Sequence, residues 1–330
     1  MSDRSWAVIG AGPVGGIAAV HLARAGEKVC VVEIKQDLAE AIEANGVTVE
    51  NLSCADGGSP DTPKSPEDTL TAKPAAIVRS IKALADLKPD TIIIAVKAAA
   101  LPVIIDDLAG VDTPFRSIIV MQNGIDNEDK VAERFGPERT FRVVVNYAGG
   151  MLEPGRIKMT FFHRPNHIGT LDPSRHDEAK EIGDLLTRAF LETAYSENVK
   201  HHEWVKTILN AGLSPVCAVS GLRMSEAMSF QPVRFITERI LKEGISVAEA
   251  AGYVMEPDFF DKAVTYLATA GPHKPSMMID IEAGLATEVE FIMQKILDYG
   301  EKHRISTPYI RAVTGFVRGL EQANRLAKEN

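Results

Sequence analysis

The fold of the first part of this 330-residue chain is decided by the stretch VIGAGPVGG, residues 8–16. The apolar run at 6–9 predicts a buried strand, and the run from 15 to 25 predicts a helix. Between them the spacing is G-x-G-x-x-G, whose first glycine permits a tight turn and whose third lets helix and strand pack closely. The middle glycine lets a diphosphate approach the backbone N–H groups at the start of the helix. The candidate cofactor-binding residues of this turn are Gly10, Ala11, Gly12, Pro13, Val14 and Gly15.

An acidic residue, Glu33, directly follows the next predicted strand, 28–32, at the distance expected for a contact with the adenosine ribose. Its carboxylate can accept hydrogen bonds from both ribose hydroxyls, and it repels a 2′-phosphate. This favours NAD over NADP as the cofactor, although Lys35 lies two residues further on and weakens the repulsion. The alternative interpretation of Glu33 is a solvated surface carboxylate.

The composition is that of an ordinary globular protein long enough for two domains, with 45% hydrophobic and 25% charged residues. A net charge of −9 argues against nucleic acid or an anionic membrane as the main partner. Three widely separated cysteines, Cys30, Cys54 and Cys217, lack metal-ligand spacing and fit reduced thiols. We expect a cytoplasmic protein with no signal peptide, no membrane span and no metal site.

Short β-branched runs alternate with helical patterns in the first part of the chain, which predicts an α/β fold with a doubly wound parallel sheet of the Rossmann type. The predicted strands are 6–9, 28–32, 91–96, 117–121, 141–146 and 167–171, with a hairpin at 148–153 and 156–162. The stretch 51–74 is rich in Pro, Ser, Asp, Thr and Gly and has little to bury, so we expect a mobile surface excursion there.

After about residue 176 the pattern becomes helical, with apolar-periodic runs at 177–192, 203–220, 231–251, 257–269, 276–300 and 308–327. We therefore divide the chain into a dinucleotide-binding domain, 1–197, and an all-α domain for substrate binding and dimerisation, 198–330. The ligand cleft is expected between these two domains.

Polar side chains lie just beyond two predicted central strands. Lys97 follows 91–96, and Asn123 with Gly124 follows 117–121. Because ligands collect at the carboxyl ends of parallel strands, Lys97 is a candidate for anchoring an anion, and Asn123 for hydrogen bonding to the cofactor or the substrate. The alternatives are a strand-end lysine in solvent and a plain Asn-Gly turn.

The helical half begins with a polar stripe on an otherwise apolar helix. Lys206, Asn210 and Ser214 follow one another at intervals of four residues and so share one face. A lysine with polar partners on such a helix has a reason to face a cleft. On this segment alone, a lysine that extends to solvent along its apolar stem is the better explanation.

Two further candidates lie in the predicted helix 276–300. Ser276 is predicted to be the N-cap of the helix, where its hydroxyl and the neighbouring N–H groups suit a substrate carboxylate. Glu288 and Glu290 point to different faces, so at most one of them reaches a ligand. An ordinary helix cap and a solvated helix face explain these residues equally well.

Six short motifs, taken in order, make the chain resemble the ketopantoate reductase (2-dehydropantoate 2-reductase) family over almost its full length. They are GAGPVG at 10–15, AVKA at 95–98, QNG at 122–124, KTILN at 206–210, SMMID at 276–280 and TEVE at 287–290. The resemblance implies a Rossmann domain and a helical domain like the C-terminal domain of 6-phosphogluconate dehydrogenase. It also implies reduction of a 2-oxo acid to a D-2-hydroxy acid with a nicotinamide cofactor.

The family's functional residues carry over one by one. The resemblance implies that Lys206 is the general acid and Glu288 the active-site glutamate. Lys97 and Asn123 correspond to the family's strand-end lysine and asparagine. A homodimer is implied as well, because helical second domains of this kind often dimerise. The substrate-binding candidates are Asn210, Ser214 and Ser276.

The chain departs from the family pattern where the hydroxyl groups of the substrate are held. Ser214 and Met224 stand in place of two asparagines, and the residues at 293–294, Met-Gln, replace an Asn-Gly pair. Replacing an asparagine by methionine removes a hydrogen-bond partner and makes the pocket more apolar, which favours a less polar 2-oxo acid. Family members also typically use NADPH and carry a basic residue near the end of the second strand, whereas Glu33 here favours NADH.

The predicted function is reduction of a 2-oxo acid, 2-dehydropantoate or a less polar relative, to the D-2-hydroxy acid with NAD or NADP. One alternative is an NAD-dependent D-2-hydroxyacid dehydrogenase for branched or aromatic substrates. Others are a protein that senses NAD(P) without catalysis and an opine or polyol-phosphate dehydrogenase. In the main hypothesis Lys206 donates a proton to the developing alkoxide, and Glu288 orients the lysine or the new hydroxyl.

Overall fold

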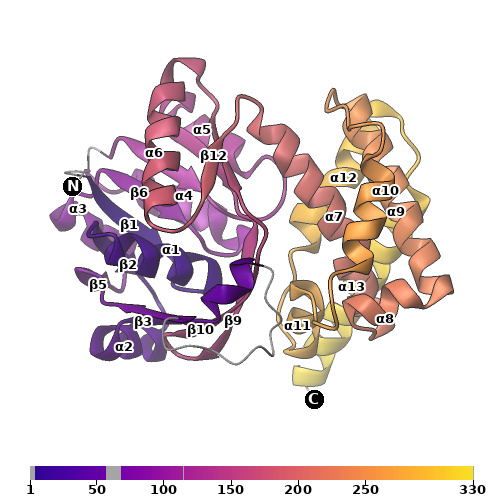
Figure 1. Ribbon diagram of the computed structural model, residues 1–330, viewed down its shortest axis with the longest axis horizontal. Helices are drawn as coiled ribbons and strands as arrows, with labels where there is room; N and C mark the ends of the chain where they lie inside the picture. Colours follow the sequence, from indigo (N-terminus) through magenta and orange to yellow (C-terminus); the bar gives the residue numbers. More distant parts are fainter. Residues whose placement is uncertain (1–3, 57–67, 114, 330) are drawn as a thin grey trace. The chain divides into compact units, whose positions relative to one another are not determined.

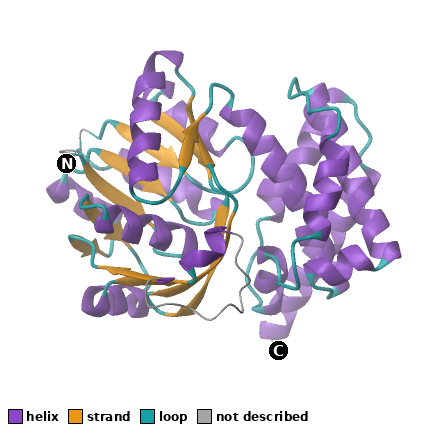
Figure 2. Cartoon of the chain, viewed as in Figure 1, coloured by secondary structure: helices purple, strands orange, loops and turns teal. Residues whose placement is uncertain are grey.

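The computed structural model describes residues 4–56, 68–113 and 115–329 of the chain. These residues divide into two compact units, Met1–Gln122 with Asp126–Val199, and Asn123–Ile125 with Lys200–Asn330. Every described strand lies in the first unit, and the second unit is helical (Figure 2). The sequence-based boundary at 197/198 lies two residues before the one at 199/200. The roles assigned to the two domains stay predictions.

The larger sheet of the first unit has the strand order β12-β11-β8-β7-β6-β1-β2-β5. Figure 1 labels β1, β2, β5, β6 and β12 of this sheet. Neighbouring strands pair in parallel, except that β11 runs antiparallel to β8. The predicted doubly wound sheet is confirmed, and two reversed strands extend it at one edge. Its strands are β1 (Ser5–Ile9), β2 (Lys28–Val32), β5 (Ala76–Val78), β6 (Thr91–Ile94), β7 (Ser117–Val120), β8 (Thr140–Val144), β11 (Asn166–Thr170) and β12 (Thr193–Tyr195).

Helices cover both faces of this sheet. In β1, Trp6 and Val8 point into one apolar core, and Ala7 and Ile9 point into another. The first core also contains residues of α1 (Pro13–Arg24), α2 (Gln36–Asn45) and α6 (His176–Arg188), and the second contains residues of α3 (Leu84–Leu87), α4 (Leu101–Ala109) and α5 (Asn127–Phe135). Because both faces of the sheet are covered by apolar cores, the central strands appear in the sequence as continuous apolar runs.

A smaller sheet with the order β4-β3-β10-β9 packs against α1. The predicted hairpin is confirmed as the antiparallel pair β9 (Tyr147–Glu153) and β10 (Arg156–Phe162). The expected mobile excursion is wrong at its end, because β4 (Thr69–Ala72) pairs with β3 (Val47–Glu50) and Leu70 packs on the core. The part of that excursion at 57–67 lies outside the described residues. Four-residue strands such as these depend on distant pairing and show no period of their own.

The second unit consists of α7 (Val199–Ser220), α8 (Met224–Ser229), α9 (Gln231–Ala250), α10 (Phe259–Ala268), α11 (Ser276–Glu282), α12 (Val289–His303) and α13 (Pro308–Glu329). The all-α prediction is confirmed, but the single helix predicted at 276–300 is wrong. The chain leaves helical geometry at Gly284, whose φ is +65°, and α12 begins only at Val289. Within the described ranges, no helix is both long and apolar enough to cross a membrane.

The buried side chain of His21, on α1, makes the stability of the first unit depend on pH. Its Nδ1 lies 2.8 Å from the carbonyl oxygen of Ala189, and its Nε2 is buried without a hydrogen-bond partner. Burial lowers the pKa of His21 from 6.5 to about 4. Between these values the unfolded chain binds the extra proton and the folded chain does not, so the free energy of unfolding falls as the pH falls from 6.5 towards 4.

We expect this group to remove about 3 kcal/mol of stability between pH 7 and pH 4. The substitution His21→Asn keeps a donor near the Ala189 carbonyl and removes the titrating group. Urea unfolding at pH 7 and at pH 4.5 should show a smaller loss of stability in the variant than in the wild type. Equal losses in the two proteins would contradict the assignment.

Candidate cofactor and active site

Two glycines of the turn between β1 and α1 are required by the packing of the chain itself. Gly10 has φ +94°, and a Cβ there would lie 2.7 Å from Cγ1 of Val96. A Cβ at Gly15 would collide with the carbonyl oxygen of Gly10 and lie 2.9 Å from Cβ of Ala95. A side chain at either position would therefore push the turn away from β6.

Gly12 differs from both of them. Its φ of −62° and ψ of −178° are open to any residue, and a Cβ there would meet nothing within 4 Å. Neither backbone conformation nor internal packing explains glycine at this position. The space that a side chain would fill lies in front of the first turn of α1, where N–H groups lack partners within the helix. A diphosphate approaching this turn gives a physical reason for Gly12.

Glu33 is held against the same turn. Its side chain is buried, Oε2 accepts a hydrogen bond from the N–H of Ala11 at 3.0 Å, and Oε1 accepts one from the N–H of Lys35 at 2.9 Å. The alternative of a solvated surface carboxylate is therefore wrong. A carboxylate oxygen accepts two hydrogen bonds, so each oxygen keeps a lone pair for a ribose hydroxyl.

Arg79 is a candidate that the sequence did not reveal. It directly follows β5, and its Nη2 donates to the carbonyl oxygen of Ile34 at 2.9 Å. This places an exposed guanidinium beside the end of β2, where some dinucleotide-binding domains hold a 2′-phosphate. The signal was weak, because β5 is a three-residue strand that periodicity does not reveal. A basic residue after the run Ala-Ile-Val at 76–78 is all that marks it.

Lys97 lies at the same edge of the sheet as the glycine turn. It is exposed just beyond β6, which pairs with β1, and the preceding residue Val96 packs against Gly10. Gln122, which follows β7, donates from Nε2 to the carbonyl oxygen of Lys97 at 3.4 Å. The structure thus brings together Lys97, the glycine turn and Glu33, as the Rossmann interpretation requires.

Asn123 and Glu288 meet within the second unit. Nδ2 of Asn123 donates to Oε2 of Glu288 at 3.1 Å. Glu288 is the residue that precedes α12. Gly124 has φ +98°, and a Cβ there would lie 2.5 Å from the carbonyl oxygen of Phe291, so a larger residue would separate the two segments. The Asn-Gly pair is therefore more than a plain turn, because it docks Asn123 beside the start of α12.

The stripe on α7 is divided by burial. Lys206 and Asn210 are half-buried on successive turns, whereas Ser214 is buried. The hydroxyl of Ser214 accepts a hydrogen bond from the N–H of Met277 at 3.4 Å, in the first turn of α11. Ser276 is exposed and is the first residue of that helix, so the prediction that it is the N-cap is wrong; the N-cap is Pro275. The structure therefore connects Ser214 to the segment that carries Ser276.

Two of the substitutions from which an apolar pocket was expected do not contribute to one. Met293 is fully buried in the apolar core of the second unit. Gln294 accepts a hydrogen bond from Arg318 and donates one to Asp298 on the exposed side of α12. The inference from these residues was wrong because α12 begins late, so position 293 faces the interior. Met224 begins α8 and is partly buried against the same core.

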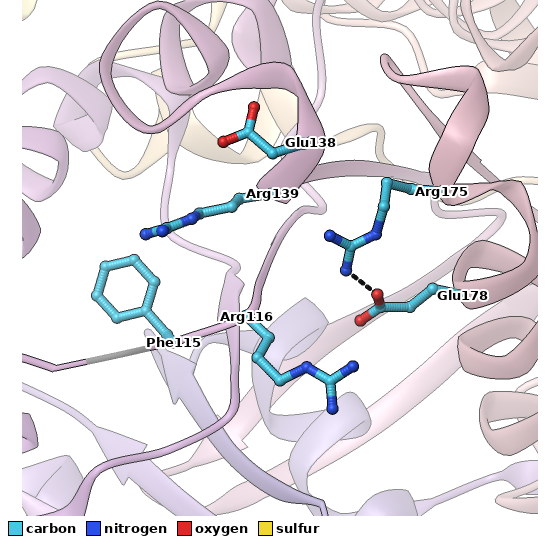
Figure 3. Close-up of a pocket in the computed structure, with 6 residues that line it drawn as sticks. All are labelled: Phe115, Arg116, Glu138, Arg139, Arg175 and Glu178. Atoms are coloured by element: carbon cyan, nitrogen blue, oxygen red, sulfur yellow. Dashed lines mark hydrogen bonds and ion pairs between the residues drawn. The ribbon is translucent and has the colours of Figure 1, made fainter.

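The first unit contains a cavity of about 490 Å³ (Figure 3). Arg116 and Arg139 directly precede β7 and β8, so the cavity is at the amino ends of the parallel strands, whereas Lys97 follows the carboxyl end of the neighbouring β6. Figure 3 shows Arg175 turned towards Glu178, with which it forms an ion pair. The charged groups of the cavity include both arginines and glutamates, and Arg175 is already paired with Glu178, so we assign this cavity no part in the chemistry. Its lining residues are Phe115, Arg116, Glu138, Arg139, Arg175 and Glu178.

Metal and thiol chemistry have no visible basis in the described residues. In these ranges no group of three His, Cys, Asp or Glu side chains is arranged to hold a metal ion. The three cysteines are buried and none of them is in a disulfide. Burial raises the pKa of Cys30 to about 11 and that of Cys217 to about 12, so both stay thiols near neutral pH.

Comparison with known proteins places this geometry in a family. Residues 6–173 match the family model described as ketopantoate reductase PanE/ApbA, and residues 198–321 match its C-terminal model. The 2-dehydropantoate 2-reductase of Streptococcus pyogenes serotype M6 is 26% identical over 316 residues, covering 95% of this chain and 97% of that protein. The enzyme of the same name from Pyrococcus horikoshii is also 26% identical and covers 95% and 96% of the two chains.

Solved structures agree with this assignment. D-mandelate dehydrogenase with NADH and anilino(oxo)acetate superposes with a TM-score of 0.85 at 21% identity, covering 98% of this chain and 99% of that one; this likeness shows the fold. The 2-dehydropantoate 2-reductase from Methylococcus capsulatus has a TM-score of 0.80 at 25% identity, covering 97% of each chain. The glycine turn, the helical second unit and these matches lead to one conclusion. The chain belongs to the ketopantoate reductase family of oxidoreductases.

Proposed function

We propose that this protein reduces a 2-oxo acid to the D-2-hydroxy acid with a nicotinamide dinucleotide held at the glycine turn. The observation that carries the proposal is Gly12, which neither the backbone nor the packing of the chain requires. The buried carboxylate of Glu33 beside the turn supports it. The names of the family's members and the NADH in the D-mandelate dehydrogenase structures support the reaction class.

In this proposal the nicotinamide, when bound, supplies the hydride that reaches the ketone carbon. Lys206 donates a proton to the carbonyl oxygen as it becomes an alkoxide, so that one hydride and one proton complete the 2-hydroxy acid. Glu288, held by Asn123 at 3.1 Å, orients Lys206 or the new hydroxyl. Ser276 and Asn210 bind the substrate, and the exposed hydroxyl of Ser276 suits its carboxylate.

We further propose a substrate less polar than 2-dehydropantoate. Ser214 and Met224 supply fewer polar groups than the asparagines of the family pattern, and the Ser214 hydroxyl is already bonded to the backbone of α11. A site that lacks partners for a substrate hydroxyl gains little from binding one. Branched or aromatic 2-oxo acids fit this composition.

An assay of NADH oxidation with 2-dehydropantoate, 2-oxoisovalerate and benzoylformate tests the reaction and the substrate class together. We expect turnover, with kcat/KM higher for the second and third acids than for the first. A preference for 2-dehydropantoate would contradict the substrate class. If the protein binds NADH but turns over no 2-oxo acid with either cofactor, it is a nucleotide sensor rather than a reductase.

The preference for NADH over NADPH depends on Glu33. We expect Glu33→Gln to lower the ratio of kcat/KM for NADH to that for NADPH by about tenfold or more, because the variant no longer repels a 2′-phosphate. Glu40→Gln on the exposed side of α2 is the matched control and should leave the ratio unchanged. A wild type that prefers NADPH, and loses that preference on Arg79→Gln, would contradict the assignment and identify Arg79 as the phosphate-binding residue.

The homodimer implied by the family resemblance belongs to the same proposal. Light scattering tests it: a molar mass twice that of one chain supports it, and the mass of a single chain rejects it.

A further inference from the structure

Both ends of the turn that carries Asn123 are bound by one buried guanidinium. The turn comprises residues 121–126, between β7 and α5. Arg142, in the middle of β8, donates from Nη1 to the carbonyl oxygen of Val120 at 3.1 Å, and Val120 is the last residue before the turn. Nε of Arg142 lies 3.7 Å from Oε2 of Glu128, the second residue of α5.

Stability does not by itself explain this ion pair. The side chain of Arg142 is 2% exposed and that of Glu128 is fully buried. Phe141 and Val143, its neighbours in β8, point into the core around α1, so by strand alternation Arg142 points to the face that Val120 helps to line. Removing two charges from water carries a penalty that their attraction offsets only in part, and an apolar pair of similar size often stabilises a protein as well.

The turn between these two anchors contains two residues with positive φ. Gly124 has φ +98°, and Asp126, a residue with a side chain, has φ +63°. L-residues adopt this left-handed conformation only at a free-energy cost, so a loose turn would relax away from it. Asn123 lies in this turn and donates to Glu288 at 3.1 Å. A shift of the turn would therefore displace a candidate site residue directly.

We propose that Arg142 and Glu128 form a staple that positions Asn123 for the reaction, a role that rests on the function proposed above. Arg142 binds the carbonyl oxygen of Val120 at the start of the turn. The ion pair with Glu128 fixes the first turn of α5, which follows the turn. The two residues touch neither cofactor nor substrate in this account. They act through the turn, as positioning residues.

The double variant Arg142→Met/Glu128→Leu separates positioning from stability, because it removes both charges and leaves apolar side chains of similar size. We expect its melting temperature to stay near that of the wild type. Amide hydrogen exchange in peptides covering 121–127 should accelerate, while exchange in β8 stays slow. With NADH saturating, kcat/KM for the 2-oxo acid should fall by about tenfold or more, since misplacement by about 1 Å can lower a rate by roughly 100-fold.

Arg4→Met is the matched control. This substitution breaks an ion pair in which the nitrogen of Arg4 lies 3.4 Å from the carboxylate of Glu178, and the two side chains are 10% and 9% exposed. Arg4 precedes β1, so this pair lies at the amino ends of the strands of the same sheet. This variant should lower stability and leave kcat/KM and exchange at 121–127 unchanged. A double variant that melts like the wild type and keeps both its exchange pattern and its kcat/KM would overturn the proposal, because the pair would then be merely structural.

Should the double variant fail to fold, Glu128→Gln gives the decisive measurement. It removes the negative charge in the first turn of α5 and keeps the hydrogen bond from Arg142 to the carbonyl oxygen of Val120. Faster exchange at 121–127 with lower kcat/KM supports the staple, and unchanged values of both overturn it. If the wild type turns over no 2-oxo acid, the proposed function fails, whereas the exchange measurement still tests whether the pair fixes the turn.

Discussion

Lys206→Ala lowers kcat by about 10²- to 10⁴-fold with NADH and 2-oxo acid saturating, while the affinity for NADH stays within a few-fold of the wild type. Lys206 is half-buried on α7, one helical turn before Asn210, and is proposed to donate the proton that completes the 2-hydroxy acid. Alanine leaves the developing alkoxide without that donor. Steady-state kinetics gives kcat, and a fluorescence titration gives the dissociation constant of NADH.

Two comparisons make the Lys206 result specific. Lys242→Ala on α9 removes an exposed lysine of the same unit and should leave kcat unchanged. Added methylamine should partly restore the activity of Lys206→Ala, because a small amine can supply the missing proton donor. A fall in kcat of less than about tenfold would show that another group protonates the alkoxide.

Gly12→Val abolishes measurable NADH binding, raising the dissociation constant by about 100-fold or more, and leaves the free energy of unfolding within about 0.5 kcal/mol of the wild type. The reason is the open space in front of Gly12, where a Cβ would meet no atom of the chain within 4 Å and the valine side chain would occupy the path of a diphosphate. Calorimetric titration with NADH and urea unfolding measure the two quantities.

Gly15→Ala is the comparison for stability, because packing requires glycine at that position. Its Cβ collides with the carbonyl oxygen of Gly10, so we expect a loss of about 1–3 kcal/mol of stability. Normal NADH binding by Gly12→Val would remove the observation on which the proposed function rests. A large loss of stability in that variant would show that Gly12 is required for packing instead.

The parts of the fold that sequence predicted well have local steric causes. The glycine spacing at 10–15 is visible within one short segment, in which Gly10 takes a positive φ and Gly15 packs on the carbonyl group of Gly10. The further contacts of these glycines with Val96 and Ala95 could not be seen in the sequence. The central strands of the large sheet are buried on both faces and appear as apolar runs. Lys97 and Asn123 could be found because they lie just beyond such runs.

The parts that sequence missed depend on partners distant in the chain. Strands β3, β4 and β5 have three or four residues each, and pairing with another strand defines them. Without β5, nothing drew attention to Arg79. The break at Gly284 was hidden because the apolar residues on either side of it continue in helical period, which misplaced Met293.

The same limit applies to single side chains. The hydroxyl of Ser214 bonds to the backbone of α11, 63 residues further on, and spacing along α7 could not show this. The ion pair of Arg142 and Glu128 joins a strand to a helix, and either residue alone reads as an ordinary charged residue in the sequence. Spacing therefore predicted which residues are candidates, and the folded structure was needed to show which of them are fixed in place and by what.

The central claim is that this chain delivers a hydride and a proton to a 2-oxo acid. The most direct measurement uses NADH that carries deuterium at the transferable position of C4, with benzoylformate as substrate and the wild-type protein. Mass spectrometry and chiral chromatography of the product should show the D-2-hydroxy acid with deuterium at C2. A product without deuterium at C2, the L-hydroxy acid, or no product with any 2-oxo acid tested would contradict the account.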